Sequence, residues 1–525
     1  MQDRDLSGMN TELIDLPPNW KWTTLGEIAD VVGGGTPKTN DPTNYEGGTI
    51  PWITPADLSG YTAKHIAHGS RFITKKGLEK SSAKMMPSGT VLFTSRAPIG
   101  YVAIASNPVC TNQGFKSLVL KEGVLPDYVY WWLKGSKDLA ESIASGTTFL
   151  ELSGAKAKQL PIPVAPLDQQ KFIVAEIEKQ FSRLDETVAN LERVKANLKR
   201  YKASVLKTAV EGRLVETEAD LAAQGRANVA GGTTPGATAR QYESGEELLK
   251  RILAERRRKW EEAELAKTKA QGKVPKDDKW KGKYKEPTAP DTTDLPKLPE
   301  GWCWTTLDAI ADVVDPNPSH RMPKYVQPGI PFVSTENFVS EEGIDFAIGK
   351  QVASETLRQQ REKFSIESGD FVLSRIGTIG KTRFLPVGKD YCLSHALVVI
   401  KVFSNLVHKG WLRRTIASDS ILSQAREGIQ SVGVPDLGMA KIRSFNLPLP
   451  PTGEQSRIVD EVDRRLSLMR EVEAQVDANL NRAERLRQSI LMGAFLGDLK
   501  DASSESLLAT SAESVQPIVR HSVMS

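Results

Sequence analysis

Leu16-Pro17-Pro18-Asn19-Trp20-Lys21-Trp22-Thr23-Thr24-Leu25-Gly26-Glu27-Ile28-Ala29-Asp30-Val31-Val32 is the stretch that decides the organisation of the chain, because it occurs twice. Residues 298–314 repeat it at an offset of 282, and 12 of the 17 positions are identical. Later blocks keep the same order: 89–100 pair with 369–380 at an offset of 280, and 163–214 pair with 448–499 at an offset of 285. Such ordered self-similarity indicates a tandem duplication of one structural unit.

The first part of each unit predicts a mixed, mainly β domain. Short β-type runs such as 90–94, 102–105, 370–374 and 397–402 are separated by Gly, Pro and Asn. A helical stretch at 127–133 interrupts them. Runs of this length and punctuation are typical of short strands joined by turns.

The second part of each unit predicts a long helix with an apolar seam. The seam positions recur at the alternating spacing of a coiled coil. In the first helix they are Ile177, Phe181, Leu184, Val188, Leu191, Leu198 and Val205, and in the second Val462, Leu466, Met469, Val476, Leu480, Ala483 and Ile490. At about 1.5 Å per residue, a helix from Leu167 to Glu211 is about 68 Å long.

Punctuation at the helix ends supports these bounds. Thr452 and Gln455 have the spacing of a capping box at the start of the second helix. Gly212 and Gly497 stand where a glycine ends a helix. Lys195 and Lys202 fall at polar seam positions, which weaken a seam but fix its register.

The predicted fold class is α+β, with two mixed, mainly β domains in tandem repeat. Each is followed by a long helix, and the two helices pair as an antiparallel coiled coil. The expected boundaries are an N-terminal extension (1–15), a first domain (16–163), a first helix (164–214), a charged central linker with a helix (215–297), a second domain (298–448), a second helix (449–499) and a C-terminal tail (500–525).

Composition excludes several classes of protein. The 525 residues are 39% hydrophobic, too apolar for a disordered chain and too many for one core. No apolar stretch approaches the ~20 residues that cross a bilayer, and the polar N-terminus does not resemble a secretory signal, so we expect a cytoplasmic protein. Three widely spaced cysteines (Cys110, Cys303 and Cys392) favour buried thiols over a disulfide framework.

The net charge of +4 is concentrated in the central linker. Between 241 and 286, 14 Lys and Arg stand against 10 Asp and Glu, which is a local +4. The segment 225–239 has the composition of a flexible linker, and 246–269 that of a helix. Two interpretations remain open: a solvated helix with its linker, or a basic arm that touches phosphates or a partner.

Motifs for catalysis or metal binding fail on spacing. The turn 33–37 (Gly-Gly-Gly-Thr-Pro) lacks the spacing of a phosphate-binding loop, and Gly380-Lys381-Thr382 has Arg375 where such a loop needs glycine. His65 and His68 have no third ligand nearby in the sequence, so we expect no metal site. We also find no GxSxG, HExxH or GxGxxG motif and no Asn/Asp-Pro-Pro-aromatic motif, and the chain is predicted to be a non-catalytic binding component.

Several blocks resemble the specificity subunit of type I restriction-modification systems. They are the Leu-Pro-x-Gly-Trp-x-Trp block at 298–304, the Gly-rich turn at 33–37, Thr-Asn-Gln-Gly at 111–114, and the Pro-x-x-Pro-Leu-x-x-Gln-x-x-Ile-Val block at 163–174. The resemblance covers the chain from about Leu16 to Leu499. The segment 248–260 is similar to a long-linker branch of that family.

The resemblance implies a DNA-binding subunit that recognises a bipartite, asymmetric site in double-stranded DNA. Each globular part would be a target recognition domain that binds one half, and the helices would be spacers on which two methyltransferase subunits dock. Those partners would bring S-adenosylmethionine and methylate adenine N6, and a restriction (motor-nuclease) subunit would use ATP and Mg. This chain would hold no cofactor.

Candidate DNA-binding residues follow from side-chain chemistry at positions where the two units differ. Arg96 or Arg375 is expected to bind a guanine edge, and Asn112 and Gln113 are expected to bind adenine. Lys38, Lys64, Lys381 and Arg383 are the expected phosphate contacts. The candidates are Thr36, Lys38, Lys64, Thr94, Ser95, Arg96, Asn112 and Gln113 in the first unit, and Ser374, Arg375, Thr378, Lys381, Arg383 and His395 in the second. Ser394-His395 replaces the Asn112-Gln113 pair, so this position has a different role in the second unit or none.

Two rival hypotheses belong to other classes. One is a duplicated scaffold or ligand-binding protein that does not act on DNA, and the other is a stand-alone enzyme on nucleic acid. Salt-dependent DNA affinity discriminates against the first, and activity of the isolated chain would favour the second. The sequence names neither the bases recognised nor the length of the gap between half-sites.

Overall fold

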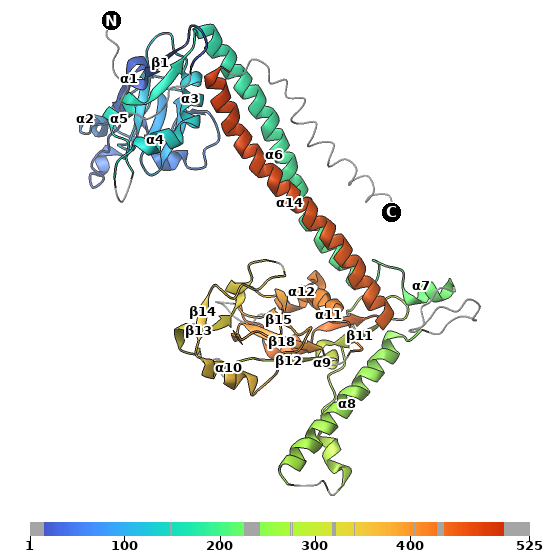
Figure 1. The fold of residues 1–525 in the computed structure, drawn as a ribbon. Coiled ribbons are helices and arrows are strands. Elements are labelled where there is room, and N and C mark those ends of the chain that lie inside the picture. The colour runs from blue at the N-terminus through green and yellow to red at the C-terminus, as the bar shows by residue number, and fades with distance from the viewer. Residues whose placement is uncertain are drawn as a thin grey trace. The chain divides into compact units, whose positions relative to one another are not determined.

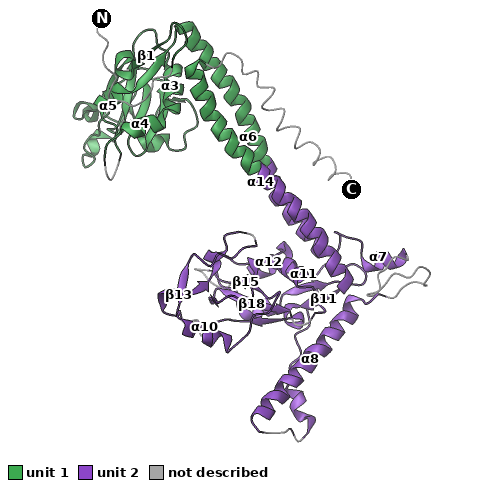
Figure 2. Ribbon diagram, viewed as in Figure 1, with its two compact units in different colours: residues 1–193, 476–525 green, residues 194–475 purple. Residues whose placement is uncertain are grey.

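The computed structural model describes residues 15–146, 150–224, 242–272, 275, 277–317, 322–340, 342–402, 405–427 and 435–497. The chain divides into two compact units, residues 1–193 with 476–525 and residues 194–475 (Figure 2). The predictions for 1–14, for the linker at 225–239 and for the tail at 500–525 fall outside the described residues. Each unit is described by itself below.

The first unit is built on three sheets. The largest has the strand order β2-β9-β6-β7-β4, and two smaller ones have the orders β5-β3-β8 and β1-β10. The strands are β1 (Lys21–Thr24), β2 (Ala29–Gly33), β3 (Ile50–Ile53), β4 (His65–Ile66), β5 (Arg71–Ile73), β6 (Val91–Ser95), β7 (Ile99–Ala105), β8 (Cys110–Thr111), β9 (Lys116–Leu120) and β10 (Pro161–Val164). The helices are α1 (Leu25–Ile28), α2 (Lys75–Glu79), α3 (Pro126–Gly135), α4 (Lys137–Ile143) and α5 (Gly154–Gln159), before the long α6 (Leu167–Val210).

The second unit repeats this plan. Its sheets have the strand orders β12-β18-β15-β16, β14-β13-β17 and β11-β19. The strands are β11 (Cys303–Thr306), β12 (Ala311–Val314), β13 (Tyr325–Val333), β14 (Lys350–Val352), β15 (Phe371–Ser374), β16 (Thr382–Phe384), β17 (Cys392–Leu393), β18 (Leu397–Val402) and β19 (Asn446–Leu449). The helices are α9 (Leu307–Ile310), α10 (Ser354–Arg361), α11 (Lys409–Ile416), α12 (Asp419–Glu427), α13 (Met439–Arg443) and the long α14 (Thr452–Leu496) (Figure 1).

The repeated block closes each domain on itself. β1 pairs antiparallel with β10, from Lys21 opposite Val164 to Thr24 opposite Pro161. β11 pairs with β19 in the same way. Because β10 and β19 lead into α6 and α14, this two-stranded sheet joins the start of each domain to the start of the helix that follows it.

The halves of α6 and α14 run antiparallel inside each unit. In the first unit the Arg487 guanidinium lies 5.2 Å from the centre of the Phe181 ring and forms an ion pair with Asp185. In the second unit Arg465 donates to the Tyr201 hydroxyl at 3.4 Å. These contacts confirm the pairing of the two long helices, and the sheets and helices of both units confirm the α+β class.

The predicted seam is buried most deeply in α14. Val462, Met469, Val476 and Ala483 follow one another at intervals of seven residues, and each is at most 8% exposed. In α6 the ends of the seam are buried, from Ile177 to Leu184 and again at Val205. Val188, Leu191 and Leu198 are half-buried, as are Leu466, Leu480 and Ile490 of α14.

The helix ends agree with the predicted glycines but not with the predicted capping box. Gly212 and Gly497 have φ of +68° and +87°, the left-handed conformation that ends a helix. At the start of α14, however, the Thr452 hydroxyl donates to the Leu406 carbonyl, and the Gln455 side chain binds Pro450 and His408. The capping-box prediction was wrong because both side chains are used to join the helix to its domain.

The central linker contains two α-helices in its described part, besides a 3-10 helix at Asp278–Lys283. They are α7 (Glu218–Ala223) and α8 (Gly245–Ala270), and α8 is the helix expected at 246–269. Leu248 and Ile252 of α8 are fully buried in the core of the second unit. Farther along α8, the Trp260 ring stacks on Trp280 with centroids 6.0 Å apart. α8 is therefore packed at its start, not fully solvated.

In the described part of the chain, no helix is both long enough and apolar enough to span a membrane. Cys110 and Cys392 are buried thiols and Cys303 is half-buried. Burial raises the pKa of each of the three thiols to about 12, which keeps them protonated at neutral pH. The described residues also hold no cluster of three or more His, Cys, Asp or Glu side chains placed to bind a metal.

Candidate nucleic-acid interface

The glycine-rich turn and the Asn-Gln pair of the first unit lie together. A Cβ atom on Gly34 would come within 1.9 Å of the Asn112 carbonyl oxygen, so only glycine allows this approach. The Thr36 hydroxyl then donates to the Gln113 side-chain oxygen. Thr36, Gln113 and the neighbouring Lys38 are exposed. The turn is therefore a packing device that brings these candidates from distant parts of the sequence onto one surface.

Asn112 itself is occupied by its own turn. Its side-chain oxygen accepts a hydrogen bond from the Gly114 backbone N–H at 2.9 Å. Its backbone N–H donates to the Ile53 carbonyl at 3.0 Å. Asn112 shapes the loop, and Gln113 is the member of the pair that projects to the surface.

Thr94 and Ser95 lie inside the first unit, and both are fully buried. The Thr94 hydroxyl donates to the Pro98 carbonyl at 2.8 Å, and the Ser95 hydroxyl donates to the Gly114 carbonyl at 3.2 Å. In the described conformation these hydroxyl groups hold a loop together. Arg96, the next residue, is half-exposed and lies 3.3 Å from Glu151.

Lys64 is compensated by acidic side chains. Its ammonium forms ion pairs with Asp127 and with Glu178 of α6. Burial opposes the charged form, but these two carboxylates outweigh it and raise the pKa of Lys64. Its charge therefore joins the domain to α6 and is not directed at solvent.

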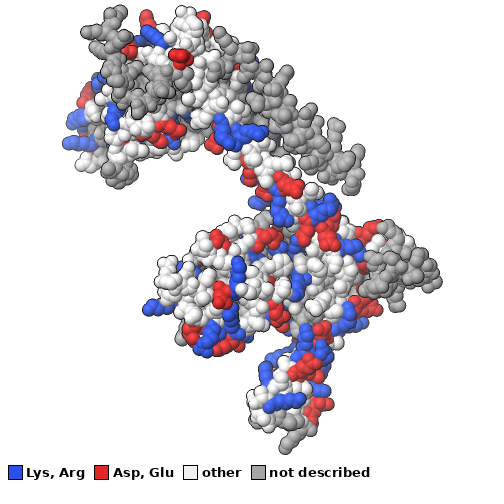
Figure 3. All heavy atoms as spheres, viewed as in Figure 1, with Lys and Arg blue, Asp and Glu red and all other residues white. Residues whose placement is uncertain are grey.

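A basic surface beside the glycine turn was missed by the sequence analysis. Residues 71–84 carry five Lys or Arg and one acidic residue, and a Cβ on Gly35 would come within 2.2 Å of the Ala83 backbone nitrogen. Lys80 and Lys84 are exposed. Figure 3 shows Lys and Arg side chains on the edge of the first unit near α2. A charge count in short windows, applied outside the linker, would have found this segment.

The second unit buries most of its candidates. The Ser374 hydroxyl, fully buried, donates to the Thr378 carbonyl at 2.5 Å and accepts from the Lys381 N–H at 2.9 Å. The Arg375 side chain is 4% exposed and lies between Asp315, at 3.4 Å, and Asp436, at 3.5 Å. These groups stabilise the loop that follows β15.

Arg383, expected to contact phosphate, also points inward. It is 7% exposed and donates to the carbonyls of Ser340 and Gly343. Its guanidinium carbon lies 4.8 Å from the centre of the Phe338 ring. In this conformation the arginine serves packing, whereas Thr378 and Lys381 are exposed and His395 is half-buried.

An arginine forms an ion pair at the same place in both units. Its acidic partner comes directly before a buried leucine in each unit. Arg96 faces Glu151 in the first unit, and Arg375 faces Asp436 in the second. Leu152 donates its N–H to the Ser95 carbonyl, and Leu437 donates to the Arg375 carbonyl, both at 2.9 Å. By this register Arg375 is the structural counterpart of Ser95. The arginine has therefore moved by one position between units, which turns Arg96 outward and Arg375 inward.

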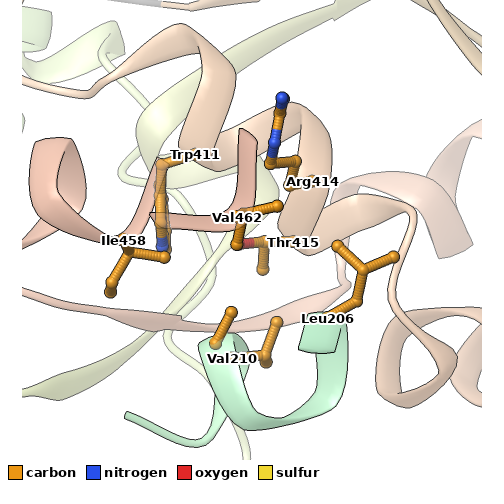
Figure 4. Close-up of a pocket in the computed structure, with 8 residues that line it drawn as sticks. Leu206, Val210, Trp411, Arg414, Thr415, Ile458 and Val462 are labelled. Atoms are coloured by element: carbon orange, nitrogen blue, oxygen red, sulfur yellow. The ribbon is translucent and has the colours of Figure 1, made fainter. Parts of the chain in front are cut away.

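The second unit also contains a small cavity beneath α11, shown in Figure 4. Side chains of α6, α11 and α14 line it, and its volume of about 10 Å³ is about that of one water molecule. The lining residues are Leu206, Ala209, Val210, Trp411, Arg414, Thr415, Ile458 and Val462. This cavity is too small for a cofactor.

Comparison with known proteins agrees with this architecture. A family model described as "Type I restriction modification DNA specificity domain" matches residues 17–200 and 299–481. Over 180 residues, 34% of the chain, the sequence is 43% identical to the type I restriction enzyme MjaIX specificity subunit of Methanocaldococcus jannaschii. Over 174 residues it is 31% identical to the EcoR124I/EcoR124II specificity subunit of Escherichia coli. These matches span 41% and 42% of the two relatives.

Two further comparisons cover nearly the whole chain. The EcoBI specificity subunit of Escherichia coli is 20% identical over 93% of this chain and 88% of its own length. A solved chain from a study of assembly and conformational transition of the type I R-M system has a TM-score of 0.57 and 18% identity, and covers 92% of this chain and 100% of its own. That likeness supports the fold over the 92% of the chain that it covers.

Proposed function

Because the chain belongs to the family of type I restriction-modification DNA specificity domains, we propose that each of its units binds one half of a bipartite, asymmetric DNA site. Membership of this family agrees with the prediction of a DNA-recognition subunit without catalytic activity of its own. The observation that carries the proposal is the duplication: one domain plan occurs twice, with different side chains on its exposed loops.

In the first unit, the proposed contact surface is the exposed group around the glycine turn. Thr36 and Gln113 offer hydrogen bonds to base edges or phosphate, and Lys38, Lys80 and Lys84 offer positive charge to the backbone. Arg96 is the further candidate for a guanine edge, once it is released from Glu151.

In the second unit, Thr378, Lys381 and His395 remain the accessible candidates. Arg375 and Arg383 are held by buried partners, so contact with DNA would require the loops that carry them to rearrange. The two units are therefore proposed to contact their half-sites differently, and the proposed contact surface of the first unit has more Lys side chains than that of the second.

The proposed partners follow from the family. Two methyltransferase subunits would dock on the long helices and supply S-adenosylmethionine for methylation of adenine N6, and restriction subunits would add ATP- and Mg-dependent cleavage. In this assembly the chain contributes recognition and spacing. The tight antiparallel contact between α6 and α14 supports the role of spacer.

A domain exchange tests the proposal. Residues 16–163 are replaced by the corresponding domain of a relative with another specificity, and methylated adenines are mapped in cells that also express the methyltransferase subunit. One half-site should change while the other half-site and the gap remain. A change in both halves, or in neither, would refute the modular assignment, and an absence of salt-dependent DNA binding by the complex would favour a scaffold that does not act on DNA.

A further inference from the structure

A positively charged side chain lies over a pair of aromatic rings in the first unit. The Arg71 guanidinium carbon is 4.8 Å from the centre of the Tyr45 ring and 5.1 Å from that of Trp52. The two rings meet edge to face, with centroids 6.0 Å apart. Trp52 is 2% exposed, whereas Arg71 is exposed. The rings therefore hold the cation at the surface of the domain, and we call the three side chains a cation–aromatic site.

The second unit repeats this site with a lysine in place of the arginine. The Lys350 ammonium is 4.8 Å from the centre of the Tyr325 ring, whose centroid is 6.3 Å from that of Phe332. The aromatic residues of the two sites pair at the repeat offset of 280. Strand register matches the cations, because Arg71 of β5 lies opposite Trp52 of β3 and Lys350 of β14 lies opposite Phe332 of β13. The site therefore occupies one position of the domain plan in both units.

In the first unit the aromatic pair also holds the glycine turn. The Trp52 indole N–H donates to the Gly35 carbonyl at 2.9 Å, and the Tyr45 hydroxyl donates to the Pro37 carbonyl at 2.7 Å. The exposed side chains of this turn belong to the proposed contact surface for DNA. The cation–aromatic site therefore borders that surface.

In both units one small sheet connects the site to a candidate loop. β3 pairs in parallel with β8, which leads into Asn112-Gln113, and β13 pairs in parallel with β17, which leads into Ser394-His395. The strands of the cations, β5 and β14, lie on the other side of β3 and β13. Each cation thus stands two strands away from the corresponding candidate loop of its own unit.

The charge of the two cations is not neutralised by a described carboxylate. Within the described part of the chain, neither Arg71 nor Lys350 forms an ion pair, whereas Lys64 and Arg375 are both held by acidic side chains. A cation that already rests on a ring loses little conformational freedom when it binds an anion. Both sites are therefore preorganised for an anionic ligand.

We propose that Arg71 and Lys350 each bind a backbone phosphate of the DNA half-site that their own unit recognises, an inference that rests on the proposed function. The halves of an asymmetric site differ in their bases but share the phosphate backbone. Between the two units the positive charge is retained, whereas the planar guanidinium with its five donors is not. A phosphate requires the charge and not the planar group, since lysine binds phosphate as a point charge.

Salt-dependent binding tests the proposal in the complex with methyltransferase subunits, on a duplex that carries the site mapped by methylation. Arg71→Gln and Lys350→Gln should each weaken binding about tenfold at ~0.1 M salt and lower the slope of log affinity against log salt by about 1, since each phosphate contact releases about one counterion. The double variant should lower the slope by about 2, and Arg71→Lys should keep it. The matched control is Lys121→Gln, which removes an exposed charge after the end of β9 that is remote from Asn112-Gln113 and should leave the slope unchanged.

Sequence preference separates a phosphate contact from a base contact. The ratio of affinities for the mapped duplex and for one with an exchanged half-site should be the same in the wild type and in both Gln variants. A changed ratio would make the cation a base-reading residue, and an unchanged slope would exclude a phosphate contact. Either result would overturn the proposal.

Two further measurements keep the outcome interpretable. Hydrogen exchange of the β3 amides reports whether the small sheet stays folded in Arg71→Gln. If it does not, Lys350→Gln decides, because the Tyr325 ring beneath Lys350 is 40% exposed and lies outside the buried core. Normal salt-dependent binding with an unchanged slope in the variants would contradict this inference alone, whereas no salt-dependent binding by the wild-type complex would contradict the proposed function as well.

Discussion

At the start of each long helix, one fully buried glutamine joins the helix to its own domain. Gln170 donates to the carbonyls of Gly123 and Ala165 and accepts from the Leu125 N–H at 2.9 Å. Gln455, its counterpart, donates to the Pro450 carbonyl at 2.9 Å and accepts from the His408 N–H at 2.7 Å. A side-chain amide both donates and accepts, so each glutamine binds backbone carbonyls and a backbone N–H at the same time.

Gln455→Ala should therefore destabilise the second unit by about 2–4 kcal/mol, because it leaves the partly buried His408 N–H and the buried Pro450 carbonyl without this partner. Hydrogen exchange of the β19 amides measures this local stability. Gln359→Ala, at an exposed position on α10, is the control and should change stability by no more than about 0.5 kcal/mol. If both variants behaved alike, the glutamine would have no part in joining helix and domain.

Glu454 gives the second unit a distinctive response to pH. Burial raises the pKa of this carboxyl to about 7, against the opposing effect of its hydrogen bonds with Glu218 and Trp302. Because the folded pKa lies above that of the unfolded chain, the folded state retains a proton that the unfolded state releases. The contribution of Glu454 to stability is thus full below about pH 4.5 and falls as the pH rises toward 7.

The prediction is a pH-dependent difference between the wild type and Glu454→Gln. From pH 4.5 to 7 the stability of the wild type should fall relative to the variant by up to about 3 kcal/mol. Hydrogen exchange of β11 and of the α14 start follows it at each pH. A constant difference across this range would show that Glu454 does not titrate there. Glu461, whose pKa is lowered to about 2 mainly by its hydrogen bond with Arg464, is a carboxylate that should not contribute in this window.

At the scale of the element, the seam residues of α6 recur at regular heptad spacing but are buried to different degrees. Leu184 is 6% exposed, and no residue of α6 from Asp185 to Ser204 is buried until Val205. Ile177 and Phe181 near one end of the seam and Val205 near the other belong to the hydrophobic cores of the two units, whereas the middle residues of α6 belong to neither core among the described residues. Seam residues of the same type should therefore contribute differently to stability.

Leu184→Ala should cost about 2–4 kcal/mol, in the range of fully buried leucines, and Leu198→Ala about 1 kcal/mol. Hydrogen exchange along α6 measures both. Arg183→Ala, at an exposed neighbour of Leu184, controls for helix propensity. Equal losses for the two leucines would mean that the middle of α6 has cover beyond α14.

At the scale of the whole molecule, the proposed function treats the helix pair as a spacer between the two recognition surfaces. One extra heptad in each helix preserves the seam and lengthens the pair by about 10 Å, which is about three base pairs at ~3.4 Å each. Because Tyr201 contacts Arg465, insertions after Leu198 in α6 and after Leu468 in α14 stay matched.

The gap between methylated half-sites should then grow by about three base pairs, while both half-sites remain the same. Mapping of methylated adenines in cells that express the methyltransferase subunit measures the gap. The control is a heptad inserted in α6 alone, which mismatches the seam and should reduce assembly without defining a new gap. An unchanged gap with the matched insertions would show that the helices do not set the spacing.

Much of the architecture could be predicted from the sequence, because a repeat and a heptad pattern are local signals. The 17-residue block placed both domains, and the seven-residue spacing from Val462 to Ala483 predicted which face of α14 is buried. Gly212 and Gly497 likewise mark helix ends by themselves, since few residues other than glycine adopt their backbone conformation.

Side-chain exposure could not be predicted from the sequence, because it depends on contacts between distant segments. Arg383 and Lys64 were both predicted to bind phosphate from their residue type. In the structure Arg383 donates to the carbonyls of Ser340 and Gly343, and Lys64 forms ion pairs with Asp127 and Glu178. Conversely, the glycine turn brings Thr36 to Gln113, 77 residues away. The sequence by itself determined the duplicated plan, its helices and its family resemblance. Only the tertiary structure decided which polar side chains face solvent, since burial is a property of neighbours and not of residue type.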